Sequence, residues 1–346
     1  MRDAAPESMP RRPAVRLRDV AAEAGVSLST ASRALSGIGA SHATTAAVAA
    51  ASKRLGYIPD PVARALRTRS TSLAGILVPS IGDPFFAELV EALEGALHAY
   101  KLDMILGDSG GSVEEEDRRL NTLVERKVDG LIVVPAHHRA STPALRRAAR
   151  RVPVVQVDRH VDDLAGDYVG LDNAAGVRTA LEHLATQGCR DFVFVSDNGA
   201  TSTGQARLQA FRTCVRHFSG VSARKPLLGT YSVRFGQEAV ERLVRQKRLP
   251  DAIVCGADIV ALGVARALHL HNVRVPGQVK VTGFDGTLFT ELCDPPLTTL
   301  RQPVGAIAAE TARLLAARLG GDSSPAQRSE FAPTLVVRRS SSQAAI

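Results

Sequence analysis

The stretch DVAAEAGVSLSTASRAL, from Asp19 to Leu35, has the pattern of two short helices with a Gly-Val-Ser break between them. Apolar residues at helical spacing define the first helix, and Gly25 is placed to end it because glycine readily adopts a left-handed conformation. Ser27 is a favourable N-cap for the second helix. This spacing packs two helices at a steep angle and leaves the second free to enter a DNA major groove. Taken alone, such a corner also occurs as a packing element in other helical proteins.

The net charge of +8 is unevenly distributed along the 346 residues. Residues 1–70 contain 11 Lys or Arg and 5 Asp or Glu, a net charge of +6, whereas residues 71–346 contain 32 and 30, a net charge of +2. A basic amino-terminal part on a nearly neutral body favours binding of a polyanion by that part. We expect residues 1–14 to be a disordered tail that adds charge and solubility.

The helical sequence continues beyond the corner. Ser41 can cap a third helix, and Gly56 is placed to end it. We therefore predict a helix-turn-helix DNA-binding domain over residues 15–59.

A proline-stiffened segment follows this domain. Pro59 and Pro61 disfavour helix in the residues before them, and a short helix is predicted after them. We assign residues 60–71 to this hinge helix and a polar linker. Leu66 has two interpretations here: an apolar wedge that unstacks a minor-groove base step, or a packing contact with the body.

From residue 72 the pattern alternates between short apolar runs and helical segments. Runs such as LAGILVPS, GLIVVPA and VKVTGFD are continuous in Val, Ile and Leu, which is typical of parallel strands buried on both faces. Helices are expected at 84–100, 113–127, 142–150, 173–187, 203–217, 233–246, 258–270 and 304–319. There are too many units for one compact sheet, so we predict two α/β subdomains, each a doubly wound parallel sheet. The body is 72–340, with subdomain one at about 72–171 plus 303–328 and subdomain two at about 172–300 plus 329–340.

Several blocks of sequence together resemble the LacI family of bacterial transcriptional regulators. They are LRDVAAEAGVSLSTASRAL, LGYIPDPVARALRT, GILVPSIGDPFFAEL, VDGLIVVPA, VDR with VGLDN, VCGADIVALG, VTGFD and TTLRQP. They follow family order from about residue 16 to 340. The resemblance implies an all-α helix-turn-helix head, a hinge helix that inserts a leucine into the minor groove, and a body like the periplasmic sugar-binding proteins with a small effector in the cleft.

The side chains of the second helix that are predicted to be exposed are Leu28, Ser29, Ser32 and Arg33. Only Arg33 has the reach and fork geometry to pair with a guanine edge, while Leu28 could touch a thymine methyl group. The resemblance places Leu28, Ser29 and Arg33 at base-reading positions, and Leu66 and Ala63 at the wedge and a small hinge position. Many family members have a basic residue where SHATTAA has none, so a phosphate contact is missing there or made by a hydroxyl. The predicted DNA-binding set is Leu28, Ser29, Thr30, Ser32, Arg33, Ala63 and Leu66.

Polar and aromatic residues near strand ends form the predicted effector site. Ring faces can stack on a sugar or base, and Asp and Arg can hydrogen-bond its hydroxyl or carbonyl groups. By resemblance to the family, and by their place at strand ends, the predicted effector-binding set is Phe85, Phe86, Asp158, Thr203, Arg207, Tyr231, Asp258 and Asp285. Arg159 and Asn173 lie nearby at strand ends.

Structural alternatives exist for several members of this set. One of the two phenylalanines is expected to pack in the core, Arg207 and Asp285 could form a structural ion pair, and Asp258 could cap the following helix. The pair His137–His138 has no metal-ligand spacing and is interpreted as a solvated loop.

The leading hypothesis is a ligand-responsive, sequence-specific transcriptional repressor that binds a palindromic double-stranded operator as a homodimer. A sugar or sugar derivative is the favoured effector, and a nucleoside or purine is the runner-up. The sequence after TLVVRRS has no heptad pattern, which favours a dimer. We predict no cofactor, no metal and no catalytic residues.

Two other classes of protein are less compatible with the sequence. An α/β enzyme acting on a sugar or nucleotide with an appended helical domain would need a phosphate-binding loop pattern that is not found. A solute-binding transport protein would need a secretory signal, and the amino terminus has none. Apolar runs are too short to span a membrane, and the four cysteines show no C-x-x-C pattern, so we expect a cytoplasmic protein without membrane contact.

Overall fold

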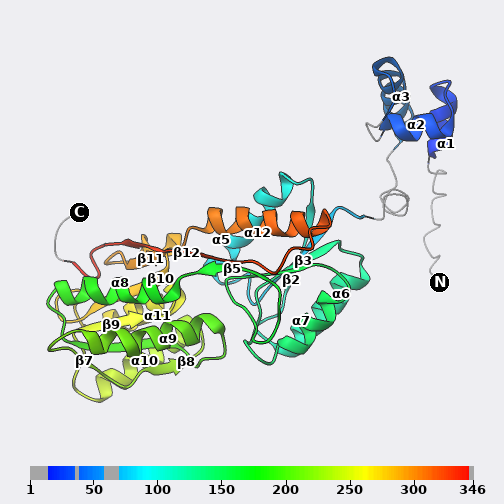
Figure 1. Cartoon of the computed structure of the whole chain (residues 1–346). Helices are drawn as coiled ribbons and strands as arrows, with labels where there is room; N and C mark the ends of the chain where they lie inside the picture. The colour runs from blue at the N-terminus through cyan, green and yellow to red at the C-terminus, as the bar shows by residue number, and fades with distance from the viewer. Residues whose placement is uncertain (1–14, 36–38, 58–69, 343–346) are drawn as a thin grey trace, which may run out of the picture. The chain divides into compact units, whose positions relative to one another are not determined.

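The computed structural model describes residues 15–35, 39–57 and 70–342. The chain divides into two compact units, Met1–Thr71 and Ser72–Ile346, which we treat separately as the head and the body (Figure 1). The expected tail and most of the predicted hinge, including Ala63 and Leu66, lie outside the described residues.

The head contains three described helices, α1 (Leu17–Glu23), α2 (Leu28–Leu35) and α3 (His42–Leu55). Their core is small and made mostly of Val and Ala: Val20, Ala21, Ala31, Ala34, Val48 and Ala51 are buried. Ser41 caps α3 by accepting a hydrogen bond from Thr44 N, and Gly56 ends it with a φ of 66°, as predicted. An ion pair of 3.0 Å between Arg54 and Glu23 joins α3 to α1.

The turn between α1 and α2 is a helix-terminating motif built around Gly25. This residue has a φ of 65°, and its N–H donates to the Ala22 carbonyl. The N–H of Val26 donates to the Ala21 carbonyl at 3.0 Å, which completes a Schellman motif. The predicted end of the first helix is therefore confirmed, and it fixes the direction in which α2 leaves the corner.

The first subdomain of the body is a parallel sheet in the order β12-β5-β4-β3-β1-β2. Its strands are β1 (Leu73–Val78), β2 (Asp103–Asp108), β3 (Gly130–Val133), β4 (Val154–Val157), β5 (Asp167–Leu171) and β12 (Arg328–Phe331). Its helices are α5 (Pro84–His98), α6 (Val113–Glu125), α7 (Thr142–Ala149) and α12 (Val304–Leu319). α12 packs against α5 and against strands β3 to β5, while α6 packs against α7.

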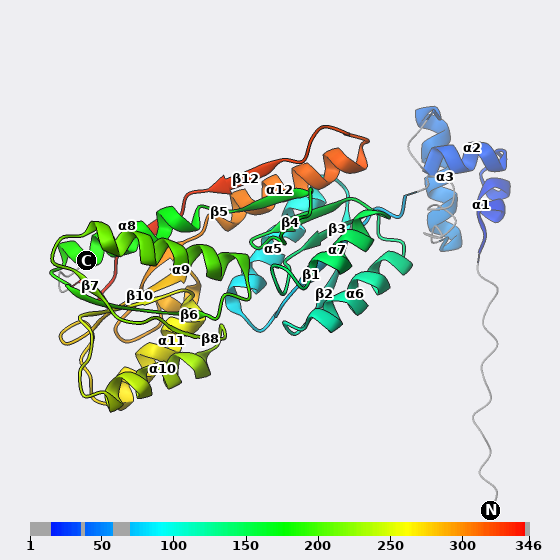
Figure 2. The same ribbon diagram turned by 60° about the horizontal axis from the view of Figure 1, so that its bottom comes forward.

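The second subdomain has a sheet in the order β13-β11-β10-β9-β6-β7, with β8 also paired to β6. Its strands are β6 (Asp191–Asp197), β7 (Ser222–Ala223), β8 (Leu227–Gly229), β9 (Ala252–Cys255), β10 (Lys280–Asp285), β11 (Thr298–Arg301) and β13 (Thr334–Val336). Figure 2 shows α8 (Asn173–Thr186) and α9 (Ser202–Cys214) on one side of this sheet, with α10 (Val233–Arg245) and α11 (Asp258–Leu270) on the other. All pairings are parallel except that of β13 with β11.

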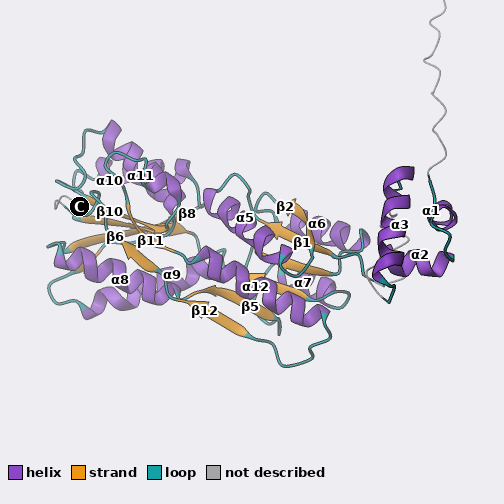
Figure 3. Ribbon diagram, turned by 90° about the horizontal axis from the view of Figure 1, so that it is seen from above, coloured by secondary structure: helices purple, strands orange, loops and turns teal. Residues whose placement is uncertain are grey.

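Three connections cross between the subdomains: from β5 to α8, from β11 to α12, and from β12 to β13. One apolar cluster continues through both subdomains and includes Val155 and Leu171 of the first and Leu181, Phe211 and Phe284 of the second. Helices flank the strands in both subdomains (Figure 3). The two doubly wound sheets therefore share one core.

The predicted helices between residues 84 and 319 all form, but one subdomain boundary differs from the expected one. Residues 329–331 are expected in the second subdomain. Instead, β12 pairs with β5 of the first sheet, from Arg328 beside Tyr168 to Phe331 beside Leu171. The residues of the sequence RSEF are alternately exposed and partly buried, and no apolar run marks this segment as a strand. The third crossover lies between Phe331 and Thr334.

Within the described part of the chain, no helix is both long and apolar enough to cross a membrane.

Replacing Gly25 tests the turn on which the head depends. Gly25→Ala places a side chain at a positive φ and should cost about 1–2 kcal/mol of local stability. We expect faster hydrogen exchange of the α1 and α2 amides in the full chain. Gly95→Ala is the control: Gly95 lies in the last turn of α5 with open space where a Cβ would stand, so alanine there should stabilise by about 0.5–1 kcal/mol. Unchanged exchange in the head of Gly25→Ala would contradict the assignment.

Candidate functional site

The outer face of α2 carries the side chains predicted to meet DNA. Ala31 and Ala34 are buried against the other helices, whereas Leu28 is 54% exposed and Arg33 is also exposed. Among the described residues, no carboxylate forms an ion pair with Arg33. The face of α2 that is not used for packing therefore presents one apolar side chain and one guanidinium without a carboxylate partner in the described ranges.

The first turn of α2 is held by a network of hydroxyl groups. Ser27 Oγ accepts a hydrogen bond from Thr30 N at 3.1 Å, so Ser27 caps the helix as predicted. Its hydroxyl also contacts Ser29 Oγ at 2.9 Å and Thr30 Oγ1 at 2.8 Å. These contacts order the helix start, where short side chains of the predicted set are exposed or half-buried.

In the body, Arg207 occupies the junction between the two sheets. It is 3% exposed and extends from α9. Its Nε donates to Asn173 Oδ1 at 2.7 Å and its Nη1 donates to the Gly256 carbonyl at 2.6 Å. Its guanidinium carbon lies 3.6 Å from the ring centre of Phe284. The ion pair with Asp285, the structural alternative to ligand contact, is present at 3.6 Å.

Asp285 ends β10 with a φ of 122°, a conformation that is strained for a residue with a side chain. Gln302 Nε2 donates to its Oδ1 at 2.9 Å. Burial raises the pKa of Asp285 well above its usual range, and the Arg207 charge only partly offsets this. Burial also raises the pKa of Asp158, against the charges of Arg159 and Arg207 and a hydrogen bond from Gln302.

Arg159 lies between aromatic rings of the two subdomains. Its guanidinium carbon is 5.2 Å from the ring centre of Phe86 and 5.8 Å from that of Tyr231. Its Nε is 3.6 Å from Asp158 Oδ2 and is a buried donor without a hydrogen-bond partner among the described residues. We call Phe86, Asp158, Arg159, Arg207, Tyr231, Asp285 and Gln302 the junction cluster.

The two phenylalanines differ in their surroundings. Both belong to the buried core and form an edge-to-face pair with ring centres 5.1 Å apart. Phe86 also has the Arg159 guanidinium over its ring, whereas no such polar contact is found for Phe85 among the described residues. Phe85 is therefore the member of the pair that serves packing.

Asp258 has a structural role in this arrangement. Its Oδ2 accepts hydrogen bonds from Gly286 N, Thr287 N and the Thr287 hydroxyl, and its Oδ1 accepts one from Thr299. Burial raises its pKa to about 6 against these hydrogen bonds. Ala257, not Asp258, is the N-cap of α11. Both carboxylate oxygens are engaged by the protein, so we remove Asp258 from the predicted effector-binding residues.

Thr203 and Tyr231 are the remaining members of the predicted effector-binding set. Thr203 is buried in the first turn of α9, with its hydroxyl 3.2 Å from that of Thr201. The Tyr231 hydroxyl is 3.4 Å from Ser196 Oγ, and burial raises its pKa to about 12. Tyr231 therefore stays protonated and can donate a hydrogen bond at neutral pH.

The interpretation of His137–His138 as a solvated loop is wrong for His138. This side chain is 5% exposed, with Nδ1 3.2 Å from Asp162 Oδ2 and Nε2 2.7 Å from Gln205 Nε2. The backbone N–H of His138 donates to the Ala200 carbonyl. His138 thus links a loop of the first subdomain to the start of α9 in the second, through partners distant in sequence.

Two members of the junction cluster are absent from the predicted set, Arg159 and Gln302. Both belong to motifs that carry the family resemblance, VDR and TTLRQP. Only the structure reveals that Arg159 Nε and Gln302 Oε1 are buried and have no hydrogen-bond partner in the described ranges. Asp83 is a further residue that sequence reasoning missed. It caps α5 through Phe85 N, and burial raises its pKa.

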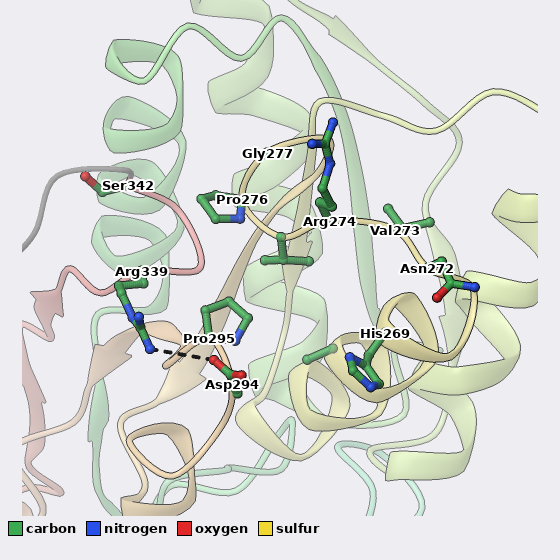
Figure 4. Close-up of a pocket in the computed structure, with 12 residues that line it drawn as sticks. His269, Asn272, Val273, Arg274, Pro276, Gly277, Asp294, Pro295, Arg339 and Ser342 are labelled. Carbon is green, nitrogen blue, oxygen red and sulfur yellow. Dashed lines mark ion pairs between the residues drawn. The ribbon is translucent and has the colours of Figure 1, made fainter.

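A separate surface hollow of about 750 Å³ lies in the second subdomain (Figure 4). It is lined by residues that include His269, Arg274 and Pro276, with the Arg339–Asp294 ion pair of 3.6 Å at its side. None of its lining residues belongs to the junction cluster.

Comparison with known proteins agrees with both parts of the chain. The pattern of the bacterial regulatory proteins of the lacI family matches residues 16–60, and that of the periplasmic binding protein-like domain matches residues 181–341. The ribose operon repressor of Halalkalibacterium halodurans is 31% identical over 323 residues, which cover 93% of this chain and 96% of that protein.

Two solved structures share the architecture. The transcriptional regulator CelR in complex with cellobiose is 30% identical, with a TM-score of 0.72, over 95% of this chain and all of that one. The lac repressor dimer bound to operator and the anti-inducer ONPF has a TM-score of 0.86 at 23% identity, over 95% and 99% of the two chains, and shows the shared fold.

A helix-turn-helix head joined to a body of two parallel-sheet subdomains defines a DNA-binding transcriptional regulator, not an enzyme. The chain belongs to the lacI family of bacterial regulatory proteins.

Removing the Asp258 carboxylate tests its structural role. Asp258→Ala leaves buried donors of the loop after β10 unpaired and should lower the free energy of unfolding by about 2 kcal/mol. Asp172→Ala is the control, because Asp172 caps α8 through a single donor, Ala175 N, and should cost about 1 kcal/mol. Denaturant unfolding measures both. An Asp258→Ala variant as stable as the wild type would return Asp258 to the candidate ligand-binding residues.

Proposed function

We propose that this protein is a cytoplasmic repressor that binds a palindromic operator as a homodimer and is switched by a small sugar-like effector at the junction of its subdomains. The observation that carries the DNA-binding part is the outer face of α2, where Arg33 is exposed and has no carboxylate partner among the described residues. A twofold-symmetric dimer presents this face twice, which matches a palindromic site.

Direct base reading by this face is sparse. Arg33 can pair with a guanine edge through two hydrogen bonds, and Leu28 can contact a thymine methyl. The hydroxyls of Ser29, Thr30 and Ser32 suit phosphate or single base contacts. Ala63 and Leu66 remain in the proposed DNA-binding set on resemblance alone, as they lie outside the described residues.

The effector part rests on the junction cluster. A buried polar group without a partner costs free energy, so the lone Arg159 Nε donor and Gln302 Oε1 acceptor are suited to a ligand that supplies both an acceptor and a donor. Sugar hydroxyls do both. Phe86 and Tyr231 offer ring faces on either side of Arg159, and the carboxylates of Asp158 and Asp285 can accept from hydroxyls. The two carboxylates balance the two guanidinium groups of the cluster, which favours a neutral polyol over an anion.

A screen of the full chain would test this proposal. We expect one or more sugars from a panel of sugars and nucleosides to raise the unfolding temperature, since a ligand that binds the native state stabilises it. A nucleoside hit without a sugar hit would select the runner-up effector. The same ligand must change the affinity for a duplex selected by the protein from a randomised pool, because coupling between two sites is reciprocal. Failure to select any sequence over scrambled duplex would contradict the repressor assignment.

Arg33→Gln tests base reading by α2. Without the fork contact to guanine, discrimination between selected and scrambled duplex should fall by about 1–3 kcal/mol, or roughly 5- to 150-fold. Arg234→Gln, an exposed site on α10, is the control for the change in charge and should leave discrimination unaltered. Fluorescence anisotropy titrations with both duplexes measure the ratio. Equal ratios for the two variants would show that Arg33 does not read bases.

The two phenylalanines give a matched pair for the effector site. Phe86→Leu removes the ring that lies under Arg159 and should weaken binding of a sugar hit by about 1 kcal/mol, roughly fivefold. Phe85→Leu should leave that affinity unchanged and lower stability by about 1 kcal/mol. Calorimetric titration and thermal unfolding of both variants separate the two effects. Weaker sugar binding by Phe85→Leu alone would reverse the assignment.

A further inference from the structure

Cations collect at one edge of the first sheet, where its parallel strands begin. Helices that precede these strands end at this edge, and it carries Lys101 before β2, Arg126 before β3, and Arg150 and Arg151 before β4. All four are exposed, and within the described ranges none forms an ion pair with a carboxylate. Lys127 adds a fifth exposed cation. We call Lys101, Arg126, Arg150 and Arg151 the basic edge.

The strand order spreads these cations in a row. β4, β3, β1 and β2 are consecutive in the sheet, so the basic edge spans three strand spacings, about 14 Å. Three exposed carboxylates lie in the same region, Asp103, Glu125 and Asp322, and Asp322 lies 4.0 Å from Arg318, so an excess of positive charge remains. A row of separate cations suits the backbone of an extended polyanion better than one small anion.

The chain enters the body at this same edge. Asp103 N donates to the Ser72 carbonyl at 2.9 Å, and Ser72 N donates to Asp129 Oδ2 at 2.7 Å. Ser72 is thus fixed beside the turns that carry Lys101 and Arg126. In the sequence, the residues before Ser72 connect the body to the head. The corresponding edge of the second sheet has no such connection.

Another explanation is local. Arg126 and Arg150 are C-cap residues of α6 and α7, where a cation interacts favourably with the helix dipole. The second subdomain has similar exposed cations near the ends of α9 and α10, namely Arg212, Arg216, Arg242 and Lys247. No carboxylate in the described part of the chain pairs with these four either. If the helix dipoles alone account for these cations, removal of the basic edge and removal of these four cations should have the same effect on DNA binding.

We propose that the basic edge is a second DNA-contacting surface, which binds phosphates of the duplex that flanks the site held by the head. This inference rests on the proposed function, since it assumes that the head binds DNA. The contacts are electrostatic and carry no base readout, because phosphates are the same in every sequence. They add affinity for flanking DNA and make binding more sensitive to salt.

Two variants with equal changes in charge test this proposal. The edge variant carries Lys101→Gln, Arg126→Gln, Arg150→Gln and Arg151→Gln, and the control carries Arg212→Gln, Arg216→Gln, Arg242→Gln and Lys247→Gln. The probe is the duplex selected from a randomised pool, used in a short form that ends at the site and a long form with one further helical turn on each side. Thermal unfolding confirms that both variants are folded.

The wild type should bind the long duplex more tightly than the short one, and the edge variant should not show this gain. Its slope of log affinity against log salt on the long duplex should fall by about 0.9 for each phosphate that the variant no longer neutralises. The control should match the wild type on both duplexes. A charge-retaining variant with Arg→Lys at the three arginines of the edge should bind the long duplex like the wild type.

Equal reductions in affinity for the edge and control variants would overturn the proposal, as would an edge variant that keeps the full gain on the long duplex. A wild type that selects no site would defeat the proposed function instead. In that case, long duplex of random sequence still decides the inference: weaker binding by the edge variant alone supports it, and equal binding by both variants overturns it.

Discussion

A single buried charge, the Arg207 guanidinium, constrains how the two sheets of the body meet. A buried cation costs several kcal/mol unless its charge and N–H groups are paired. Arg207 donates to Gly256, which follows β9 of the second subdomain, and to Asn173, the first residue of α8, whose Nδ2 donates in turn to the Leu171 carbonyl at the end of β5 in the first subdomain. Asp285 at the end of β10 supplies the opposite charge. Because Asn173 also donates to the end of β5, Arg207 and Asn173 together connect the carboxyl ends of the two sheets.

Gln302 gives this junction a connection to the rest of the body. It stands on the crossover from β11 to α12 and donates to Asp285, and its side chain also lowers the pKa of Asp158 against the larger effect of burial. A ligand that takes the Asp285 carboxylate must therefore alter the contacts of a crossover segment. α12 packs on α5 and on three strands of the first sheet, so we infer that such a change acts on the subdomain that is joined to the head. The size of the response is limited by the difference in ligand affinity between the two arrangements.

Local patterns predict those parts of the fold that have local causes. The helices from α5 to α12 follow from apolar periodicity, and in the structure side-chain caps such as Asp83, Ser112 and Ser232 begin several of them. β7, β8 and β12 escape prediction, because they are two to four residues long, lack buried apolar runs and exist only through pairing with β6 or β5. The same reason applies to His138, whose burial depends on Asp162 and Gln205, and to Asp258, whose four donors come from a loop and strand distant in sequence. Resemblance finds most of the junction cluster, but buried atoms without partners in the described ranges, such as Arg159 Nε, are visible only in three dimensions.

The distribution of charge suggests how specificity and affinity are divided between the two units. One fork contact from Arg33 to a guanine would supply about 1–3 kcal/mol of discrimination, while specific and non-specific DNA binding typically differ by about 4–10 kcal/mol. Two copies of α2 in a dimer would bring the discrimination energy closer to this typical difference. The energy needed to deform the central base steps can add further discrimination. Phosphate contacts from the body would stabilise every sequence equally, so they raise occupancy without changing the choice of site. An effector that moves the first subdomain would then change both the spacing of the two heads, which sets specificity, and the approach of the basic edge, which sets affinity.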